Sequence, residues 1–235
     1  MSERPRVAFT IEQCWHKVPG GTAVAALGMA RSLVGRDLDL RGVAAAHRRS
    51  PPAPWTPPMR VHHLPLPRLA LYEAWHRLRR PSVERATGAI DVIHATANAM
   101  PPKTAPLVLT IHDLAFVHHP EHFTARGVRF FKRGLELAKS DADVVLCPSH
   151  ATIADCEEAG FSAERLRLVP LGVEVEPATE DEVAEARRRY HLERPYLLWV
   201  GTIEPRKNLI RVIEALHQLH VLDGGLHQRL DRALA

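Results

Sequence analysis

The sequence has little of what marks secreted or membrane-spanning proteins. Its three cysteines, Cys14, Cys147 and Cys156, are an odd number without metal-binding spacing, so we expect free thiols in a reducing compartment. No apolar run approaches the roughly 20 residues that a membrane-spanning helix needs. The first residues are not followed by the apolar segment of a signal peptide. These absences predict a cytoplasmic protein.

The sequence also lacks a large excess of either charge. Lysine and arginine number 31 against 27 acidic residues, a formal net charge of +4. That surplus suits anionic partners such as nucleotides or lipid headgroups without distinguishing between them. The arginine run 187–189 ends a predicted helix with an acidic first turn, where it compensates the helix dipole. We therefore expect no nucleic-acid partner.

What the sequence does contain is an alternation of short apolar segments with helical patterns. The predicted strands are residues 6–11, 38–45, 60–64, 91–95, 107–111, 143–147 and 165–169. Segments this apolar are typical of a parallel sheet that is covered on both faces. The alternation predicts an α/β fold, a Rossmann-like doubly wound parallel sheet.

The C-terminal part predicts a linker and the beginning of a second domain. Thr179 and Glu182 have the spacing of a capping box, which begins a helix. The apolar run 196–200 is predicted to be a buried strand, followed by a polar turn and a helix. We expect a first domain over residues 1–175, a linker helix over 176–195, and an incomplete second Rossmann-like domain over 196–235.

Polar residues follow several predicted strands at their carboxyl ends, where ligands of open α/β sheets bind. His94 ends one strand, and His112 and Asp113 follow the next. His112 is the best single catalytic candidate; the alternative is a histidine that only caps its strand. Ser149 follows a third strand, where it is a good helix N-cap.

A glycine turn, Gly20-Gly21-Thr22, follows the first strand and precedes a helix predicted from about Ala23. Glycines let the backbone approach a ligand closely, and a helix N-terminus favours an anion. The turn lacks the G-x-G-x-x-G spacing, which argues against a nicotinamide cofactor.

The segment that contains His112, Asp113, His118, His119 and His122 raises the alternative of a metal cluster. His118 and His122 are four residues apart, but Pro120 between them interrupts any helix that would place both on one face. The prediction from spacing is therefore that no metal is bound.

The segment 68–80 alternates an apolar stripe with four arginines. The stripe consists of Leu71, Tyr72, Trp75 and Leu78. The simplest interpretation is a core-facing side of a helix. The alternative is a basic amphipathic helix that lies on anionic lipid, as a peripheral contact at the inner face of the membrane.

Two adjacent cations, Arg206 and Lys207, lie where the helix after the 196–200 run begins. Cations are unfavourable near the positive end of a helix dipole, and a bound phosphate would compensate both. The alternative is that both are solvated surface charges.

Four segments resemble, in the right order, the retaining family-4 glycosyltransferases of the GT-B fold. They are the glycine turn that ends at Thr22, Thr-Ile-His-Asp-Leu at 110–114 followed by Pro-Glu-His-Phe at 120–123, the run 147–174 that ends in a Gly-Val-acid turn, and Gly-Thr-Ile-Glu-Pro-Arg-Lys-Asn-Leu at 201–209. In that family an arginine and a lysine of the last turn hold the diphosphate of a nucleotide sugar. Many members place the arginine directly after the glycine, where this chain has Thr202.

The resemblance implies His112, Arg206 and Lys207 as catalytic residues, with the histidine beside the transferred sugar. It implies substrate-binding positions at Gly20, Gly21, Thr22, His94, Asp113, Ser149, Thr202 and Asn208. The implied reaction moves a sugar, such as a mannose-type hexose, from a nucleoside-diphosphate sugar to a glycan or lipid-linked acceptor with retention. No metal cofactor is expected, because cationic side chains and helix N-termini can neutralise the diphosphate.

Two other functions stay open at this point. The family's paired glutamates, E-x7-E, have no counterpart after Lys207. The chain is therefore also interpretable as a truncated, catalytically silent acceptor-binding or partner module that needs a separate donor-domain chain. A nucleotide-sugar epimerase of the same shape is disfavoured, because the His-Asp-Leu and Glu-Pro-Arg-Lys-Asn segments fit transferases better.

Overall fold

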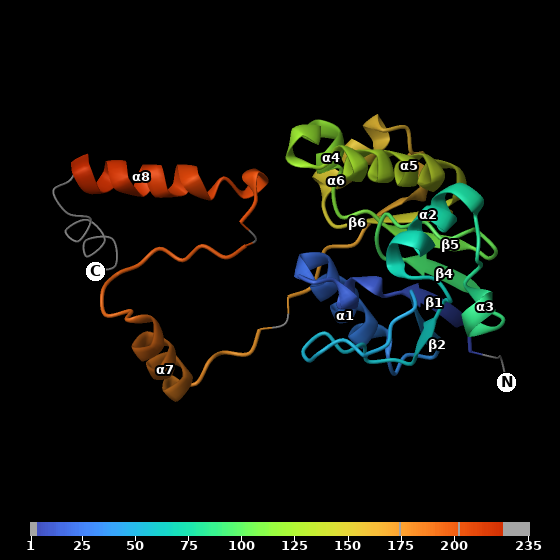
Figure 1. Ribbon diagram of the computed structural model, residues 1–235, viewed down its shortest axis with the longest axis horizontal. Coiled ribbons are helices and arrows are strands. Elements are labelled where there is room, and N and C mark those ends of the chain that lie inside the picture. Colours follow the sequence, from blue (N-terminus) through green and yellow to red (C-terminus); the bar gives the residue numbers. More distant parts are fainter. Residues whose placement is uncertain (1–3, 174, 202, 223–235) are drawn as a thin grey trace. The chain divides into compact units, whose positions relative to one another are not determined.

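The computed structural model describes residues 4–173, 175–201 and 203–222. The chain divides into two compact units, residues 1–172 and 173–235, which are described separately below (Figure 1). We refer to them as unit 1 and unit 2.

Unit 1 is built on a seven-stranded sheet in which every pair of neighbouring strands is parallel. The strands are β1 (Arg6–Thr10), β2 (Asp39–Ala44), β3 (Val61–His63), β4 (Val92–Ala95), β5 (Leu107–Thr110), β6 (Val144–Cys147) and β7 (Leu166–Leu168). Their order is β3-β2-β1-β4-β5-β6-β7. Strands are therefore added toward one edge of the sheet from β1 to β3 and toward the other edge from β4 to β7. This is the order of a Rossmann-like sheet, and the predicted fold class and all seven predicted strands are confirmed.

Helices connect these strands in unit 1. They are α1 (Gly20–Leu33), α2 (Arg68–Leu78), α3 (Glu84–Thr87), α4 (Ala115–His118), α5 (Ala125–Asp141) and α6 (His150–Glu158), with the 3-10 turns η1 (Glu12–Trp15), η2 (Pro120–His122) and η3 (Ala163–Arg165). Two of the N-caps follow from the sequence. The Thr124 hydroxyl accepts a hydrogen bond from the Gly127 amide, and the Ser149 hydroxyl accepts one from the Thr152 amide. Each satisfies a backbone donor that a helix start leaves unpaired.

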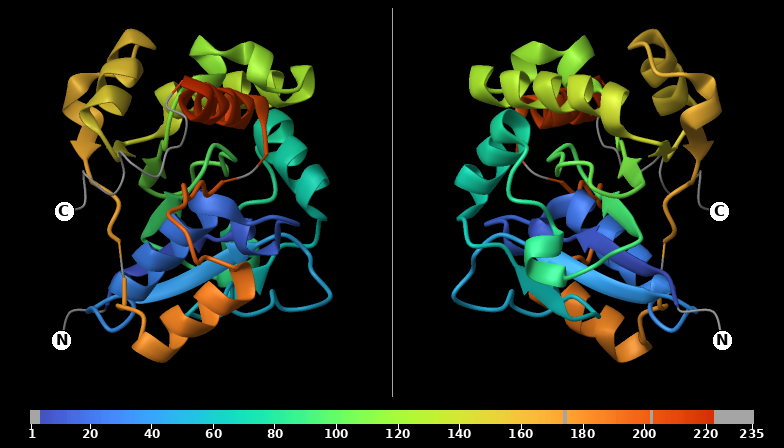
Figure 2. Two further views of the ribbon diagram at one scale, coloured as in Figure 1. Left: turned by 90° about the vertical axis from the view of Figure 1, so that its left-hand side faces the viewer. Right: turned by 90° about the vertical axis from the view of Figure 1, so that its right-hand side faces the viewer.

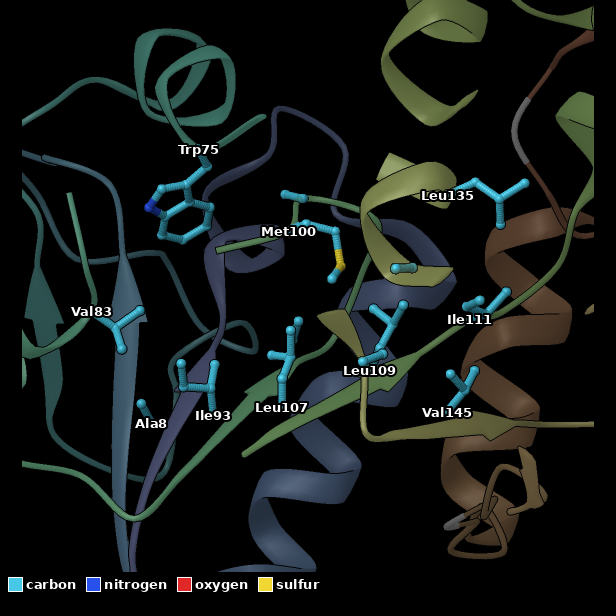
Figure 3. Packing of buried hydrophobic residues seen from close by; sticks show 14 of the residues in the cluster. Ala8, Trp75, Val83, Ile93, Met100, Leu107, Leu109, Ile111, Leu135 and Val145 are labelled. Carbon is cyan, nitrogen blue, oxygen red and sulfur yellow. The ribbon is translucent and has the colours of Figure 1, made fainter. Parts of the chain in front are cut away.

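The two faces of the sheet carry separate hydrophobic clusters. Ala8 and Phe9 are neighbours on β1, yet they belong to different clusters because successive strand side chains point to opposite faces. Phe9 packs in the cluster that includes Leu27 of α1. The larger cluster joins the strands to Trp75 of α2 and Leu135 of α5 (Figure 3). Both faces are therefore covered, as an all-parallel sheet requires.

The apolar stripe of α2 is core-facing only in part. Leu71 and Trp75 are 0% and 2% exposed, but Leu78 is 70% exposed. The prediction for Leu78 is wrong because α2 ends there. The next residue, Arg79, takes the left-handed conformation with φ 53°, so no further helical turn follows to cover Leu78.

Unit 2 contains α7 (Glu180–Tyr190), η4 (Pro205–Lys207) and α8 (Leu209–Leu222). The predicted capping box is present: Thr179 and Glu182 exchange hydrogen bonds between side chain and backbone. The predicted buried strand at 196–200 is wrong, because these residues form no strand, and Leu198 and Val200 are 77% and 83% exposed. A strand needs a neighbour for its backbone hydrogen bonds, and the described residues of unit 2 contain helices and connecting segments but no strand.

Two predicted absences concern cysteine and the membrane. Cys14, Cys147 and Cys156 are free, as predicted, and the structure also buries all three. Within the described ranges, none of the helices combines the length and the apolar character needed to cross a lipid bilayer.

Candidate functional site

A buried hydrogen-bonded group joins the carboxyl ends of β1 and β4. The Thr96 amide donates to Thr10 Oγ1 over 2.9 Å, and the Thr96 hydroxyl donates to the Thr10 carbonyl oxygen over 2.6 Å. Gln13 of η1 donates its side-chain amide to Thr96 Oγ1 over 2.7 Å. Buried polar groups that are hydrogen-bonded to one another hold a fixed geometry, so this group is a rigid part of the carboxyl edge of the sheet.

His112 lies two residues after the end of β5 and contacts this hydrogen-bonded group at Thr96. Its Nε2 lies 3.2 Å from the Thr96 carbonyl oxygen. Because a carbonyl oxygen only accepts, Nε2 carries the ring proton in this pairing, and Nδ1 is the acceptor atom of the ring. Burial lowers the pKa of His112, although the Thr96 carbonyl and the Asp113 carboxylate act in the opposite direction. The half-buried imidazole is therefore neutral and oriented at neutral pH.

Ser149 and His112 are brought together through Thr152 of α6. The Thr152 hydroxyl donates to the His112 carbonyl oxygen over 3.3 Å. Ser149 Oγ accepts from the Thr152 amide over 3.1 Å and lies 3.0 Å from Thr152 Oγ1. Ser149 thus serves as the N-cap of α6 and also belongs to the edge that carries His112. Thr152 was not predicted from the sequence, although its place three residues after a capping serine was a signal.

Asp113 has a local structural role beside the same edge. Its side chain is exposed, and Oδ1 accepts a hydrogen bond from the Ala115 amide over 3.0 Å, where α4 begins. Because Asp113 is exposed and follows His112 directly in the chain, it remains a substrate-binding candidate.

His94 lies in the core rather than at the ligand edge that the sequence predicted. It is 6% exposed, its Nε2 is 2.9 Å from Thr110 Oγ1, and its ring meets Phe9 edge-to-face at 5.0 Å. Burial lowers its pKa to about 4. The reason is that β4 continues through Ala95, so His94 points onto a face of the sheet and not beyond the strand end.

The glycine turn is already helical. Gly20, Gly21 and Thr22 form the first turn of α1, three residues earlier than predicted, and all three are exposed. A Cβ atom at Gly20 or Gly21 would meet nothing within 4 Å, and Gly20 has a φ of +66° that favours glycine. The first-turn amides are therefore open to a ligand, and an anion is the group that they attract.

A second buried polar group, which was not predicted from the sequence, lies in η1 directly after β1. Glu12 is 4% exposed; its carboxylate accepts from the Ala45 amide over 2.8 Å and pairs with His47 Nε2 at 2.9 Å. The His47 ring stacks on the Trp15 indole, with centroids 4.7 Å apart. These contacts tie η1 to the end of β2 and so hold Gln13 in place beneath Thr96.

The remaining predicted site residues belong to unit 2. Thr202 lies outside the described residues, and only the backbone position of Arg206, within η4, is described. Lys207 is exposed at the end of η4. Asn208 follows in the left-handed conformation, and its carbonyl accepts from the Arg211 amide over 3.2 Å at the start of α8. The cationic turn thus leads directly into a helix start, as the sequence predicted.

Comparison with known solved structures identifies the same fold elsewhere. Anabaena Alr3699/HepE, solved in complex with UDP and glucose and also in complex with UDP-glucose, aligns with a TM-score of 0.51 in each case. It is 18% identical, and the alignment covers 80% of this chain and 50% of that protein. At this identity the likeness concerns the fold alone.

Comparison of sequences identifies the family. O-antigen chain mannosyltransferase B of Escherichia coli is 24% identical over 132 residues, which are 54% of this chain and 35% of that protein. This chain therefore spans about half the length of HepE and aligns with about a third of the mannosyltransferase. The profile of the family described as Glycosyltransferase Family 4 matches residues 19–177, which include β2 to β7 and His112. The match extends over more than half of the sequence, and the chain belongs to glycosyltransferase family 4.

Proposed function

We propose that this chain works in the transfer of a hexose from a nucleoside-diphosphate sugar to a glycan or lipid-linked acceptor, with retention of configuration. Family membership supports sugar transfer itself. The name of the Escherichia coli relative supports a mannose-type hexose, and the HepE complexes support a nucleoside-diphosphate sugar as donor.

The observation that carries this proposal is the fixed, neutral imidazole of His112 at the carboxyl edge of the sheet. With Nε2 bound to the Thr96 carbonyl, Nδ1 accepts a hydrogen bond from a hydroxyl of the transferred sugar. A neutral ring of lowered pKa orients a sugar better than it removes a proton. Retaining transfer suits such a residue, because it depends more on stabilising the leaving group than on a strong base.

Within unit 2 we assign the leaving diphosphate to Arg206 and Lys207, and within unit 1 we assign a donor phosphate or the acceptor to the start of α1. The open first turn of α1, at Gly20, Gly21 and Thr22, offers backbone N–H groups. Arg206 and Lys207 supply the cations in the turn before α8, and Thr202 and Asn208 are further substrate-binding candidates in the same stretch of sequence. These groups act where negative charge develops, so the transfer step itself needs no metal ion.

The domain assignment is part of the same proposal. Residues 1–175 form the acceptor side, 176–195 a linker helix, and 196–235 the beginning of a donor-binding domain. The division of the chain between residues 172 and 173 supports the first boundary. In the alternative, the chain is a silent acceptor-binding module and a separate chain supplies the donor domain.

The test is donor binding and transfer by the 235-residue chain. Saturation-transfer NMR against UDP- and GDP-hexoses detects binding, and a radiolabelled donor detects transfer. We expect His112→Ala and Lys207→Ala each to lower transfer at least about tenfold, by loss of a hydrogen bond to a sugar or a charge on the diphosphate. His191→Asn, at an exposed left-handed position after α7, is the matched control and leaves transfer unchanged.

The two functions give different results in that assay. If the chain transfers sugar and Lys207→Ala abolishes that transfer, the silent-module function is excluded. Absence of donor binding at millimolar concentration excludes an active transferase in this chain. Transfer that is insensitive to His112→Ala refutes the role given to the imidazole.

We further propose a peripheral contact with anionic lipid through neighbouring faces of α2 and α5, which lie beside each other (Figure 2). One hollow there is lined by Glu73, His76, Arg77, Arg126, Arg129, Phe130 and Arg133. Glu73 is its one carboxylate among four guanidinium groups, and it pairs with Arg77 at 2.9 Å and Arg126 at 3.6 Å. The surplus positive charge supports attraction to acidic headgroups, at roughly 1 kcal/mol per basic residue.

Vesicle co-sedimentation tests this contact. The double variant Arg126→Glu/Arg129→Glu is expected to lose at least about tenfold in affinity for phosphatidylglycerol vesicles. The matched control, Arg31→Glu/Arg36→Glu, makes the same charge change at exposed positions in and after α1. Equal losses in both variants, or equal binding to neutral phosphatidylcholine vesicles, would refute a specific lipid-facing surface.

A further inference from the structure

Three metal-ligating side chains meet in the turn between α4 and α5. His119 Nδ1 lies 3.3 Å from Glu121 Oε1, and His122 Nε2 lies 3.8 Å from the same oxygen. One potential ligand atom of each residue lies within 4.8 Å of the other two. The two imidazole rings are stacked, with centroids 5.3 Å apart and planes inclined by 25°.

The backbone of this turn explains why helical spacing did not reveal the group. α4 ends at His118, and Pro120 begins a 3-10 turn, as expected of a residue that cannot continue an α-helix. A 3-10 turn has about three residues per turn, so side chains three positions apart lie one above the other. His119 and His122 are three positions apart. This turn, with His119 as its N-cap, therefore brings the two imidazoles together, and Glu121 lies between them in the chain.

The distances fit a tetrahedral zinc ion. Zinc binds nitrogen and oxygen ligands at roughly 2.0–2.2 Å, which places tetrahedral ligand atoms about 3.3 Å apart. The separations of 3.3 Å and 3.8 Å around Glu121 Oε1 are at or near that value before any ion draws them in. Two imidazoles suit zinc better than magnesium or calcium, which prefer oxygen ligands. His119 and Glu121 are exposed, so water can fill the fourth position.

The adjacent histidine is engaged elsewhere. His118 Nε2 pairs with Asp155 Oδ1 of α6 at 3.0 Å, so it faces away from the group although it is the nearest neighbour in sequence. Its exposure, 43% of the side chain, is comparable with that of the ligands. His118 is thus a matched internal control.

We propose that His119, Glu121 and His122 bind one Zn²⁺ ion, with water as the fourth ligand, and that the ion fixes the turn between α4 and α5. The site is distinct from the transfer chemistry proposed above, and it takes no step in that reaction. A bound ion joins residues on both sides of Pro120 and so stabilises the segment that precedes the Thr124 cap of α5.

The experiment uses the untagged 235-residue chain, stripped with a chelator and titrated with ZnCl₂ by calorimetry. We expect one strong site per chain. His119→Ala, Glu121→Gln and His122→Ala should each weaken zinc binding at least about tenfold, because each removes a ligand. His118→Ala should leave the affinity unchanged. Mg²⁺ should not compete.

A second measurement avoids substitutions. Zinc titration of the unaltered chain should shift the ring NMR signals of His119 and His122 and leave those of His118 in place. Absence of zinc binding up to millimolar concentration would overturn the proposal. So would an affinity that survives both His119→Ala and His122→Ala, or ring signals that do not move.

Discussion

Among single residues, His94 gives the core of unit 1 a built-in sensitivity to acid. Its ring is buried between Phe9 and Thr110, and burial lowers its pKa from 6.5 to about 4. Between these values the unfolded chain binds a proton that the folded chain does not. The free energy of unfolding therefore falls as the pH falls from 6.5 toward 4, and levels off below that. One such group contributes at most about 1.4 kcal/mol per pH unit.

We predict that His94→Gln makes this pH dependence shallower, because the variant has no titrating group at that position. Urea unfolding, measured at intervals between pH 6.5 and 4, gives the slope. Some slope remains, since burial also lowers the pKa of His76 to about 4. His150→Gln, at an exposed position in α6, is the control and keeps the original slope. An unchanged slope in His94→Gln would contradict the assignment.

At the scale of elements, the position of α5 on the sheet depends on a close approach at Gly134. A Cβ atom there would lie 2.5 Å from the Asn98 carbonyl oxygen and 3.2 Å from His76 Cε1. Asn98 follows β4, and His76 belongs to α2. Gly134 therefore lets three segments that are distant in sequence pack against one another, and these segments cover the larger hydrophobic cluster.

We predict that Gly134→Ala destabilises the fold by about 1–3 kcal/mol, because backbone must move to admit the methyl group. The same substitution at Gly28 of α1 should have the opposite sign. A Cβ there meets nothing within 4 Å, and alanine favours a helix interior by roughly 0.8–1 kcal/mol over glycine. Urea midpoints of the two variants test the pair, and shifts in the same direction would contradict the packing argument.

At the scale of the whole molecule, the two units differ in how much apolar surface they bury. Both hydrophobic clusters are made of unit 1 residues. In unit 2, by contrast, Leu198, Val200 and Ile203 are 77%, 83% and 87% exposed. Burial of apolar area is the main stabilising contribution to a fold, so unit 1 should hold nearly all of the cooperative stability.

We predict that residues 1–172 alone unfold in urea at the same midpoint as residues 1–235. Near-ultraviolet circular dichroism follows the tertiary packing of unit 1 in both proteins. A lower midpoint in the shorter protein would show that residues 173–235 stabilise unit 1.

The sequence alone determined the strands of unit 1 and the start of two helices. Alternation of apolar segments with helical patterns predicted the seven parallel strands, and the capping residues Ser149 and Thr179 predicted where two helices begin. These features depend on neighbours within a few residues, so they can be predicted from the sequence. The position of His112 after a strand was readable for the same reason.

Only the tertiary structure decided which residues meet. It joined Thr10 to Thr96 beneath His112, placed His94 in the core, and left the 196–200 run exposed. Each outcome depends on a partner far away in sequence, or on the absence of a neighbouring strand among the described residues of unit 2. Strand order and burial are set by packing of the whole sheet, which the local pattern of residues does not encode.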